Sequence, residues 1–212
     1  MLSPVDHSHY SDTDPAVASQ PALVHLGLPD LTLDLTTDRG VFSWQSIDRG
    51  TDFLLRTAPP PPASGAILDL GAGYGPIALA MAKRSPSAQV WALDVNNRAL
   101  DLVRRNASAA HIGNIVACRP DGVPADLRFT AIYSNPPTHI GRDPLRELMT
   151  LWLSRLTADG NAYLVMSRHL GADSFAQSLE TGGFEVDRMR SRGGYRLLHV
   201  QTAPRSGDDD AS

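Results

Sequence analysis

The sequence predicts an α/β protein with a mostly parallel sheet, helices on both faces of that sheet, and an antiparallel hairpin at the C-terminal end. Short apolar runs alternate with helical patterns from residue 66 onward. Strands that alternate with helices in this way pair in parallel and are covered on both faces. The last two apolar runs are separated by Gly193-Gly194, a tight turn of the kind that joins antiparallel strands.

The segment before this alternation supplies one strand and one helix. Residues 31–37, "LTLDLTT", alternate leucine with polar residues, which predicts a half-exposed strand. The stretch "SIDRGTDFLLRTA" predicts a helix that begins near Asp48 and places Phe53 and Leu54 on its inner face. Four consecutive prolines, residues 59–62, then form a stiff connector to the main sheet.

The alternating part of the chain supplies the rest of the sheet and its covering helices. Strands are expected over residues 66–70, 89–94, 115–118, 129–134 and 161–167, and in the final hairpin over 184–190 and 197–202. Helices are expected over residues 75–85, 97–110, 143–156 and 171–182. Pro76 is compatible with the first of these helices because a proline is tolerated in the first turn.

Length and composition indicate a single domain. A chain of 212 residues suits one globular domain. We expect that domain to occupy residues 31–203, between a flexible segment over 1–30 and a disordered acidic tail over 204–212.

Charge and cysteine content exclude several classes of protein. A net charge of -4 argues against a protein that coats nucleic acid by bulk electrostatics, and leaves room for a local basic patch. Cys118 is the single cysteine, so no internal disulfide forms and no metal site is expected. We find no signal peptide and no apolar run that could span a bilayer, and therefore expect a cytoplasmic protein with no membrane partner. The oligomeric state is not predicted.

A glycine-rich loop, "LDLGAGYGPIA", follows the first core strand and opens a helix. Gly71, Gly73 and Gly75 allow a tight turn and the close approach of a ligand, although a turn without a ligand has the same pattern. Asp94 ends the second core strand, where a carboxylate can accept both hydroxyls of a ribose. The G-x-G-x-G spacing suits a dinucleotide less well than G-x-G-x-x-G, and no Gly-Lys-Ser/Thr follows to make a phosphate-binding Walker loop.

These residues resemble the S-adenosylmethionine site of the class I methyltransferases, which have a Rossmann-like fold. The resemblance implies that Asp69, Gly71, Gly73 and Gly75 lie on the methionine part of the cofactor. It also implies that Asp94 holds the ribose. Asp121, in "CRPDG", either lies against the adenine amino group or is a surface turn residue.

A second motif, "YSNPPTHIGRDP", follows the fourth core strand. In a sheet of this topology that strand lies beside the first, so Asn135, Pro136 and Pro137 face the cofactor site. The prolines fix their own φ angles and donate no N–H, which leaves the Asn135 side-chain oxygen and the Pro136 carbonyl as a rigid row of acceptors. Such a row can hold both hydrogens of an exocyclic amine and direct its lone pair at an electrophilic methyl group. We therefore expect these three residues to be catalytic.

Three separated stretches resemble the small-subunit ribosomal RNA guanine-N2 methyltransferases, over about residues 31–201. They are "TTDRGVFSWQSIDRGTDFLL", "SNPPTHIG" and "GGYRLL". The resemblance implies that Gly40, Val41, Phe42 and Ser43 lie over the cofactor and target pocket. We expect the substrate pocket to be formed by Phe42, Ser43, Thr138 and His139. Related adenine and glutamine enzymes carry a stacking aromatic residue where this chain has Thr138, so a target base would stack on His139 or Phe42 instead.

The predicted function is transfer of a methyl group from S-adenosylmethionine to guanine N2 of RNA, with ribosomal RNA or a ribosomal subunit as partner. Two alternatives stay open: methylation of an amine on a small molecule or a protein, and a non-catalytic module that binds the cofactor or RNA. The larger members of the family carry an additional N-terminal domain that helps bind RNA, whereas about thirty residues precede the similar region here. Four arginines of the final hairpin either discourage strand pairing or contact phosphates: Arg188, Arg190, Arg192 and Arg196.

Overall fold

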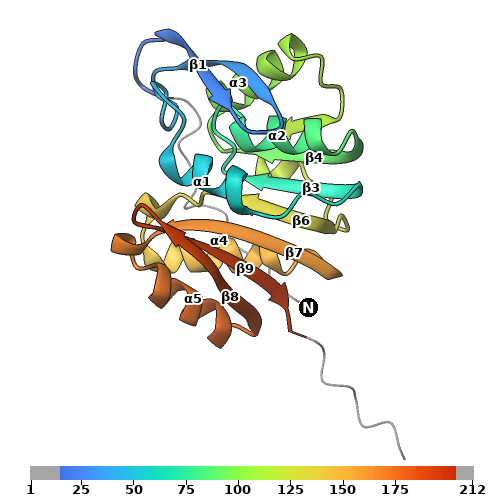
Figure 1. Cartoon of the computed structure of the whole chain (residues 1–212), viewed down its shortest axis with the longest axis vertical. Coiled ribbons are helices and arrows are strands. Elements are labelled where there is room, and N and C mark those ends of the chain that lie inside the picture. The colour runs from blue at the N-terminus through green and yellow to red at the C-terminus, as the bar shows by residue number, and fades with distance from the viewer. Residues whose placement is uncertain (1–14, 204–212) are drawn as a thin grey trace, which may run out of the picture.

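The computed structural model describes residues 15–203, in which a seven-stranded sheet forms the centre and a separate two-stranded hairpin precedes it (Figure 1). The hairpin strands are β1 (Pro21–Gly27) and β2 (Thr32–Asp38). The sheet contains β3 (Ser64–Leu70), β4 (Ser87–Leu93), β5 (Ile115–Cys118), β6 (Phe129–Ser134), β7 (Leu156–Ser167), β8 (Phe184–Arg192) and β9 (Tyr195–Thr202). The helices are α1 (Arg49–Thr57), α2 (Pro76–Arg84), α3 (Asn97–Ala109), α4 (Arg142–Leu153) and α5 (Ala172–Thr181), with short 3-10 turns η1 (Pro120–Gly122), η2 (Thr138–Ile140) and η3 (Arg168–Leu170).

The strand order of the sheet is β5-β4-β3-β6-β7-β9-β8. Strands β3 to β7 pair in parallel, and β9 pairs antiparallel with both β7 and β8. The chain runs outward from β3 to β5 and then returns to place β6 on the other side of β3. The loops that follow β3 and β6 therefore diverge at a topological switch point, where sheets of this kind bind their ligands.

Apolar side chains cover both faces of the sheet, as the α/β pattern predicts. Ile67 of β3 belongs to a cluster that includes side chains from α1, α2, α3 and the β1–β2 hairpin. Its neighbour Leu68 belongs to a second cluster, which includes side chains from α4 and α5. Successive residues of a strand point to opposite faces, so this alternation places helices on both sides. The prediction of a mostly parallel sheet with an antiparallel C-terminal hairpin is confirmed.

The prediction of a flexible segment over residues 1–30 is wrong for the second half of that segment. Strand β1 occupies Pro21–Gly27 there and pairs antiparallel with β2. The strand buries Val24 and Leu26 and exposes Leu23, which is the alternation of a strand with one covered face. Figure 1 shows this hairpin beside α3, at the end of the molecule opposite β8. Residues 1–14 and the predicted acidic tail over 204–212 lie outside the described residues.

Most other differences from the prediction are shifts at element ends. The main exception is β7, which begins at Leu156 rather than at residue 161 and contains an irregularity in its pairing with β6. Gly160 lies in this irregular part, where a Cβ would come within 3.0 Å of the Phe129 carbonyl oxygen. A glycine is required there because the two backbones approach closely. None of the described helices is both long enough and apolar enough to cross a membrane.

Asn106 joins the hairpin to the main sheet. This buried residue of α3 accepts a hydrogen bond from the Thr36 N–H at 2.8 Å and donates from Nδ2 to the Thr36 carbonyl at 2.9 Å. The same Nδ2 donates to the Tyr74 carbonyl at 2.9 Å. One side chain thus satisfies backbone groups of β2 and of the glycine loop that would otherwise lack partners.

Replacing Asn106 with alanine should lower the free energy of unfolding by about 2–4 kcal/mol, because the variant leaves these backbone groups unsatisfied. Urea unfolding followed by circular dichroism measures the change. Arg105→Ala, an exposed position on the same helix, serves as the matched control and should shift the free energy by less than about 0.5 kcal/mol. Equal small changes in both variants would contradict the role assigned to Asn106.

Candidate functional site

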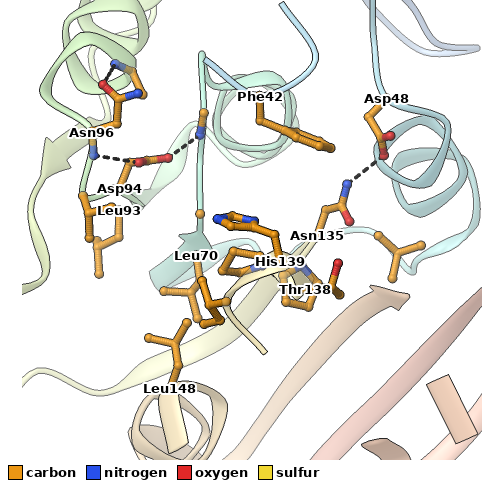
Figure 2. Close-up of a pocket in the computed structure, with 18 of the residues that line it drawn as sticks. Phe42, Asp48, Leu70, Leu93, Asp94, Asn96, Asn135, Thr138, His139 and Leu148 are labelled. Carbon is orange, nitrogen blue, oxygen red and sulfur yellow. Dashed lines mark hydrogen bonds between the residues drawn. The ribbon is translucent and has the colours of Figure 1, made fainter. Parts of the chain in front are cut away.

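A cavity of about 950 Å³ opens at the carboxyl ends of β3, β4, β6 and β7 (Figure 2). Its walls come from the loops after these strands, from the segment after β2, and from Tyr195 at the start of β9. Nine of the residues that the sequence singled out line this one cavity: Phe42, Gly71, Gly73, Asp94, Asn135, Pro136, Pro137, Thr138 and His139. Four others do not line it: Ser43, Asp69, Gly75 and Asp121.

The three glycines of the loop after β3 serve different purposes. All three have positive φ angles, a backbone conformation that favours glycine. A Cβ on Gly71 or Gly73 would meet nothing closer than 3.8 Å, so both positions leave room on the cavity side. A Cβ on Gly75 would lie 2.5 Å from the Leu79 side chain. Gly75 therefore permits the close packing of α2, and it does not line the cavity.

Asp94 lies at the opposite end of the cavity from Asn135 and orders the glycine loop. Its Oδ2 accepts the Gly73 N–H at 2.8 Å, and its Oδ1 accepts the Asn96 N–H at 2.9 Å. Burial raises the pKa of Asp94, and the backbone hydrogen bonds from Asn96 and Gly73 oppose that rise. Each carboxylate oxygen has further acceptor capacity, so the side chain can still accept two ligand hydroxyls.

Asp69 lies behind the glycine loop and does not line the cavity, whereas the sequence predicts that it lies on the methionine part of the cofactor. Its side chain is fully buried, and its Oδ2 accepts the Ala78 N–H in the first turn of α2 at 2.8 Å. Its Oδ1 has no hydrogen-bond partner among residues 15–203. Burial raises the pKa of Asp69 to about 8, assisted by the charge of Asp94 and opposed by the Ala78 N–H. Asp69 thus ties β3 to α2 and supports the loop from below.

The remaining two predicted residues, Asp121 and Ser43, do not line the cavity, and Asp121 has the position of the surface turn residue that the sequence left open. Asp121 lies in η1 with its side chain 84% exposed, and its neighbour Pro120 lines the cavity in its place. Ser43 has a φ of 53° and donates from Oγ to the Ser46 carbonyl, so its hydroxyl stabilises its own turn. Phe42, which precedes Ser43, is 65% exposed at the cavity edge.

Two hydrogen bonds fix the orientation of the Asn135 side chain. Nδ2 donates to Asp48 Oδ1 at 2.7 Å (Figure 2). It also donates to Thr51 Oγ1 at 3.1 Å, so both amide hydrogens are used. Turning the amide over would place its oxygen against the Asp48 carboxylate, an unfavourable contact between two acceptors. Asn135 Oδ1 receives no hydrogen bond from residues 15–203 and remains an acceptor beside the cavity. The Pro136 carbonyl accepts the Thr138 N–H at 2.8 Å and has a second lone pair left.

Asp48 and Thr51 are functional residues that sequence reasoning missed. Asp48 was predicted only as the start of a helix, and it does cap α1, since its Oδ1 accepts the Gly50 and Thr51 N–H groups at 2.8 and 3.0 Å. It is 87 residues from Asn135 in sequence. The available signal was its position within the first of the three stretches that carried the family resemblance.

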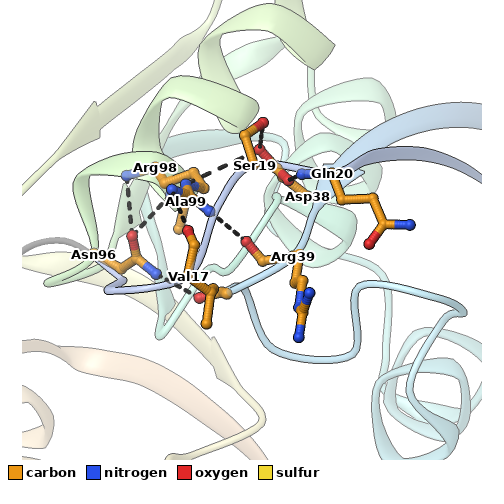
Figure 3. A network of polar contacts seen from close by, with 9 residues as sticks. Val17, Ser19, Gln20, Asp38, Arg39, Asn96, Arg98 and Ala99 are labelled. Carbon is orange, nitrogen blue, oxygen red and sulfur yellow. Dashed lines mark hydrogen bonds and ion pairs between the residues drawn. The ribbon is translucent and has the colours of Figure 1, made fainter.

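A network of polar contacts holds the segment after β2 against the cavity (Figure 3). Arg98 donates to the Arg39 carbonyl at 2.6 Å and to the Val17 carbonyl at 3.0 Å. Asn96 donates from Nδ2 to the Gly40 carbonyl at 3.0 Å. These contacts hold down the backbone that carries Val41 and Phe42 into the cavity wall. The Arg98 guanidinium is thereby occupied with backbone carbonyls.

The hairpin arginines separate into two pairs. Arg188 forms ion pairs with Glu180 at 2.8 Å and Asp173 at 3.7 Å, and Arg196 pairs with Asp173 as well. Arg190 and Arg192 are exposed, and neither forms an ion pair within the described part of the chain. Two of the four positive charges are thus offset by acidic residues of α5.

Comparisons with known proteins agree with this geometry. The model of the methyltransferase small domain family matches residues 32–199. The uncharacterized protein YbxB of Bacillus subtilis (strain 168) is 31% identical over 196 residues, which cover 91% of this chain and 98% of that protein. Ribosomal RNA small subunit methyltransferase C of Shewanella amazonensis is 32% identical over 76% of this chain and 50% of its own length.

A solved structure has the same fold over most of the chain. The T. thermophilus 16S rRNA N2 G1207 methyltransferase, in complex with AdoMet and guanosine, superposes with a TM-score of 0.74 at 23% identity. The match covers 89% of this chain and 52% of that protein. This chain therefore spans about half the length of the two relatives that have a named rRNA activity.

The buried Asp69 should make the stability of the protein depend on pH. Because its pKa is raised from 3.8 to about 8 on folding, the folded state binds a proton more tightly than the unfolded state. The stability of the wild-type protein should therefore fall, relative to Asp69→Asn, as pH rises between these two values, by at most about 1.4 kcal/mol per pH unit. Urea unfolding of both proteins across this range measures the difference. Asp121→Asn, an exposed control, should leave the pH dependence unchanged, and parallel curves for wild type and Asp69→Asn would refute the assignment.

Proposed function

Because this chain belongs to the methyltransferase small domain family, we propose that it transfers a methyl group from S-adenosylmethionine to guanine N2 of ribosomal RNA. The activity of an S-adenosylmethionine-dependent methyltransferase follows from the family. The observation that carries the finer proposal is the Asn135 side chain, whose oxygen is directed by Asp48 and Thr51 to act as an acceptor beside the cavity. A site that only binds a cofactor has no need of such an acceptor.

The residues present fit S-adenosylmethionine. Gly71 and Gly73 leave open space where a side chain would obstruct a ligand, and Asp94 offers carboxylate oxygens to ribose hydroxyls. Apolar side chains from Leu93, Ala99 and Pro120 line the cavity near Asp94 and suit the adenine ring. When bound, the cofactor supplies an electrophilic methyl group on a sulfonium.

The amine is held by two acceptors in this proposal. Asn135 Oδ1 and the Pro136 carbonyl each accept one hydrogen of the exocyclic amine, so its lone pair, otherwise delocalised into the ring, is directed at the methyl group. Both acceptors are oriented before the substrate arrives: the amide by Asp48 and Thr51, and the carbonyl by the fixed φ angles of the two prolines. The methylated nitrogen is strongly acidic while it carries the extra proton, so it releases that proton without a dedicated base.

Two observations support a base as the carrier of the amine. Phe42 and His139 are exposed rings that both line the cavity between Asp94 and Asn135 (Figure 2). Single-stranded bases stack on aromatic side chains of this kind. The relatives named as rRNA methyltransferases, one of them with guanosine bound, point to the same substrate class.

Methylation of a protein or small-molecule amine is the second candidate. It is favoured by the net charge of -4 and by the ion pairs that occupy Arg188 and Arg196, since RNA affinity rises with the number of phosphates that a protein neutralises. A methyl-transfer assay that offers RNA, protein and small metabolites in parallel distinguishes the two candidates.

Incubation with labelled S-adenosylmethionine should place label in RNA when total RNA, ribosomal subunits, protein extract and small metabolites are offered in parallel. Digestion of the labelled RNA should release N2-methylguanosine, which chromatography identifies. Asn135→Ala should reduce the transfer rate by at least about 100-fold, because it removes one of the two preorganised acceptors. Label confined to protein or metabolites would refute the RNA proposal.

Asp94→Asn should weaken binding of S-adenosylhomocysteine by about 10- to 100-fold in calorimetry, the change expected when a hydrogen bond to a charged group is lost. Asn135→Ala and Asp121→Asn, which alter the far end of the cavity and an exposed turn, should bind with wild-type affinity. Tight binding of NAD(H) without binding of S-adenosylhomocysteine would overturn the cofactor assignment.

A further inference from the structure

The Asp48 carboxylate has one oxygen that neither the fold nor the orientation of Asn135 requires. Oδ1 accepts all three of its hydrogen bonds, from the Gly50 and Thr51 N–H groups and from Asn135 Nδ2. Oδ2 accepts none from residues 15–203. A serine or threonine would cap α1 as well with a single oxygen. The second oxygen of Asp48, a residue that lines the cavity, therefore calls for another explanation.

The surroundings of Asp48 provide no cation to neutralise it. Among the described residues, no lysine, arginine or histidine forms an ion pair with this carboxylate. The tyrosines around it experience its charge: the pKa of Tyr195 is raised by burial and then by Asp48, and so is that of Tyr74. The Tyr195 ring packs on the first turn of α1, where a Cβ on Gly50 would lie 2.9 Å from it. A half-buried carboxylate in this position is best satisfied by a donor on the ligand.

Three acceptors are thus grouped at this end of the cavity: Asn135 Oδ1, the Pro136 carbonyl and Asp48 Oδ2. The bases differ in what they can donate to such a group. In guanine the N2 amine stands between N3, an acceptor, and the N1–H, so on its N1 side two donors lie next to each other. In adenine and cytosine the ring nitrogen beside the amine is an acceptor, and its lone pair would face the carboxylate. Guanine is the standard base whose donors match this group of acceptors.

We propose that Asp48 is a specificity-determining residue, whose Oδ2 accepts the N1–H of the target guanine while Asn135 and Pro136 hold its N2 amine. This inference rests on the proposed function. A site built to accept a hydrogen bond rejects an analogue that lacks the donor, because its own buried polar group is then left unpaired. An adenine would meet both that loss and repulsion between its N1 lone pair and the carboxylate.

Binding of free nucleosides to the full chain saturated with S-adenosylhomocysteine tests the inference, with ligand-observed NMR as the readout. Guanosine and inosine both carry the N1–H, whereas 2-aminopurine riboside keeps the N2 amine and has an acceptor at N1. The wild-type protein should bind guanosine about 10- to 100-fold more tightly than 2-aminopurine riboside, the ratio expected for one hydrogen bond to a charged group.

Asp48→Asn should abolish or reverse this preference. Its amide can keep an oxygen toward the α1 N–H groups and presents an NH2 donor where Oδ2 stood, which suits 2-aminopurine riboside and opposes guanosine. Inosine should lose affinity by the same factor as guanosine, because the two share the N1–H. A residue that only capped α1 or oriented Asn135 would change the affinity for guanosine and 2-aminopurine riboside together, because both carry the N2 amine, and would leave their ratio unaltered.

Thr51→Val is the matched control. It removes the other partner of Asn135 Nδ2 without altering the cavity-facing oxygen of Asp48, so the ratio of guanosine to 2-aminopurine riboside should stay at its wild-type value. Asp48→Ser retains a capping oxygen and lacks the second acceptor. It should lose the preference for guanosine without gaining affinity for 2-aminopurine riboside, and it provides the same test if Asp48→Asn does not fold.

The outcomes separate this inference from the proposed function. Suppose that the wild-type protein forms N2-methylguanosine in RNA, and that Asp48→Asn and Asp48→Ser keep the wild-type ratio of affinities for guanosine and 2-aminopurine riboside. This result would refute the role of Asp48 and leave the proposed function standing. A wild-type protein that binds guanosine no better than 2-aminopurine riboside refutes the role of Asp48 whatever its activity. Loss of the preference in Asp48→Asn, together with its retention in Thr51→Val, supports the inference.

Discussion

The parallel pairing of β3 with β6 is the constraint on which the site depends. It sets Leu70 and Ser134 side by side at the ends of the two strands, where the buried Ser134 hydroxyl donates to the Leu70 carbonyl at 2.7 Å. The loops that follow are then neighbours although 64 residues of sequence separate them. A Cβ on Gly71 would lie 3.9 Å from Pro137, so the glycine loop after β3 and the loop after β6 meet at one point. The chemistry needs both loops at one place, and a topological switch point supplies it.

A further wall of the site is formed by residues that precede the sheet in sequence. Helix α1 brings Asp48 and Thr51 to the end of β6, and the segment after β2 brings Val41 and Phe42 over the cavity. The upstream hairpin is therefore part of the catalytic domain, attached through Asn106 and Arg98 to α3. Removing it would expose the apolar surface of α3 and detach the segment after β2, which carries Val41 and Phe42, from its support.

Local patterns in the sequence were sufficient to predict the sheet, the glycine loop, the end of β4 at Asp94 and the position of Asn135 beside the cofactor loop. Each of these depends on periodicity or on turn residues within a few positions. The strand β1 was missed because it follows a polar, proline-containing stretch that obscures its short alternation. The contact between Asp48 and Asn135 is purely tertiary, and nothing near either residue indicates it. The sequence did not indicate that Asp69 and Gly75 lie outside the cavity lining for a related reason, since whether a loop residue faces the cavity or the core depends on packing.

Asn96 connects two walls of the cavity, the one that carries Asp94 and the one that carries Gly40. Its N–H donates to Asp94, its Nδ2 donates to the Gly40 carbonyl, and its Oδ1 accepts from the first N–H groups of α3. The position of the segment that covers the cavity and the position of the Asp94 carboxylate are thus set by the same side chain and peptide. Thermodynamic reciprocity then relates the two: a ligand at Asp94 that favours the closed arrangement of the covering segment must itself bind more tightly when that segment is closed. Binding at Asp94 and the position of the covering segment are thus coupled through this one asparagine.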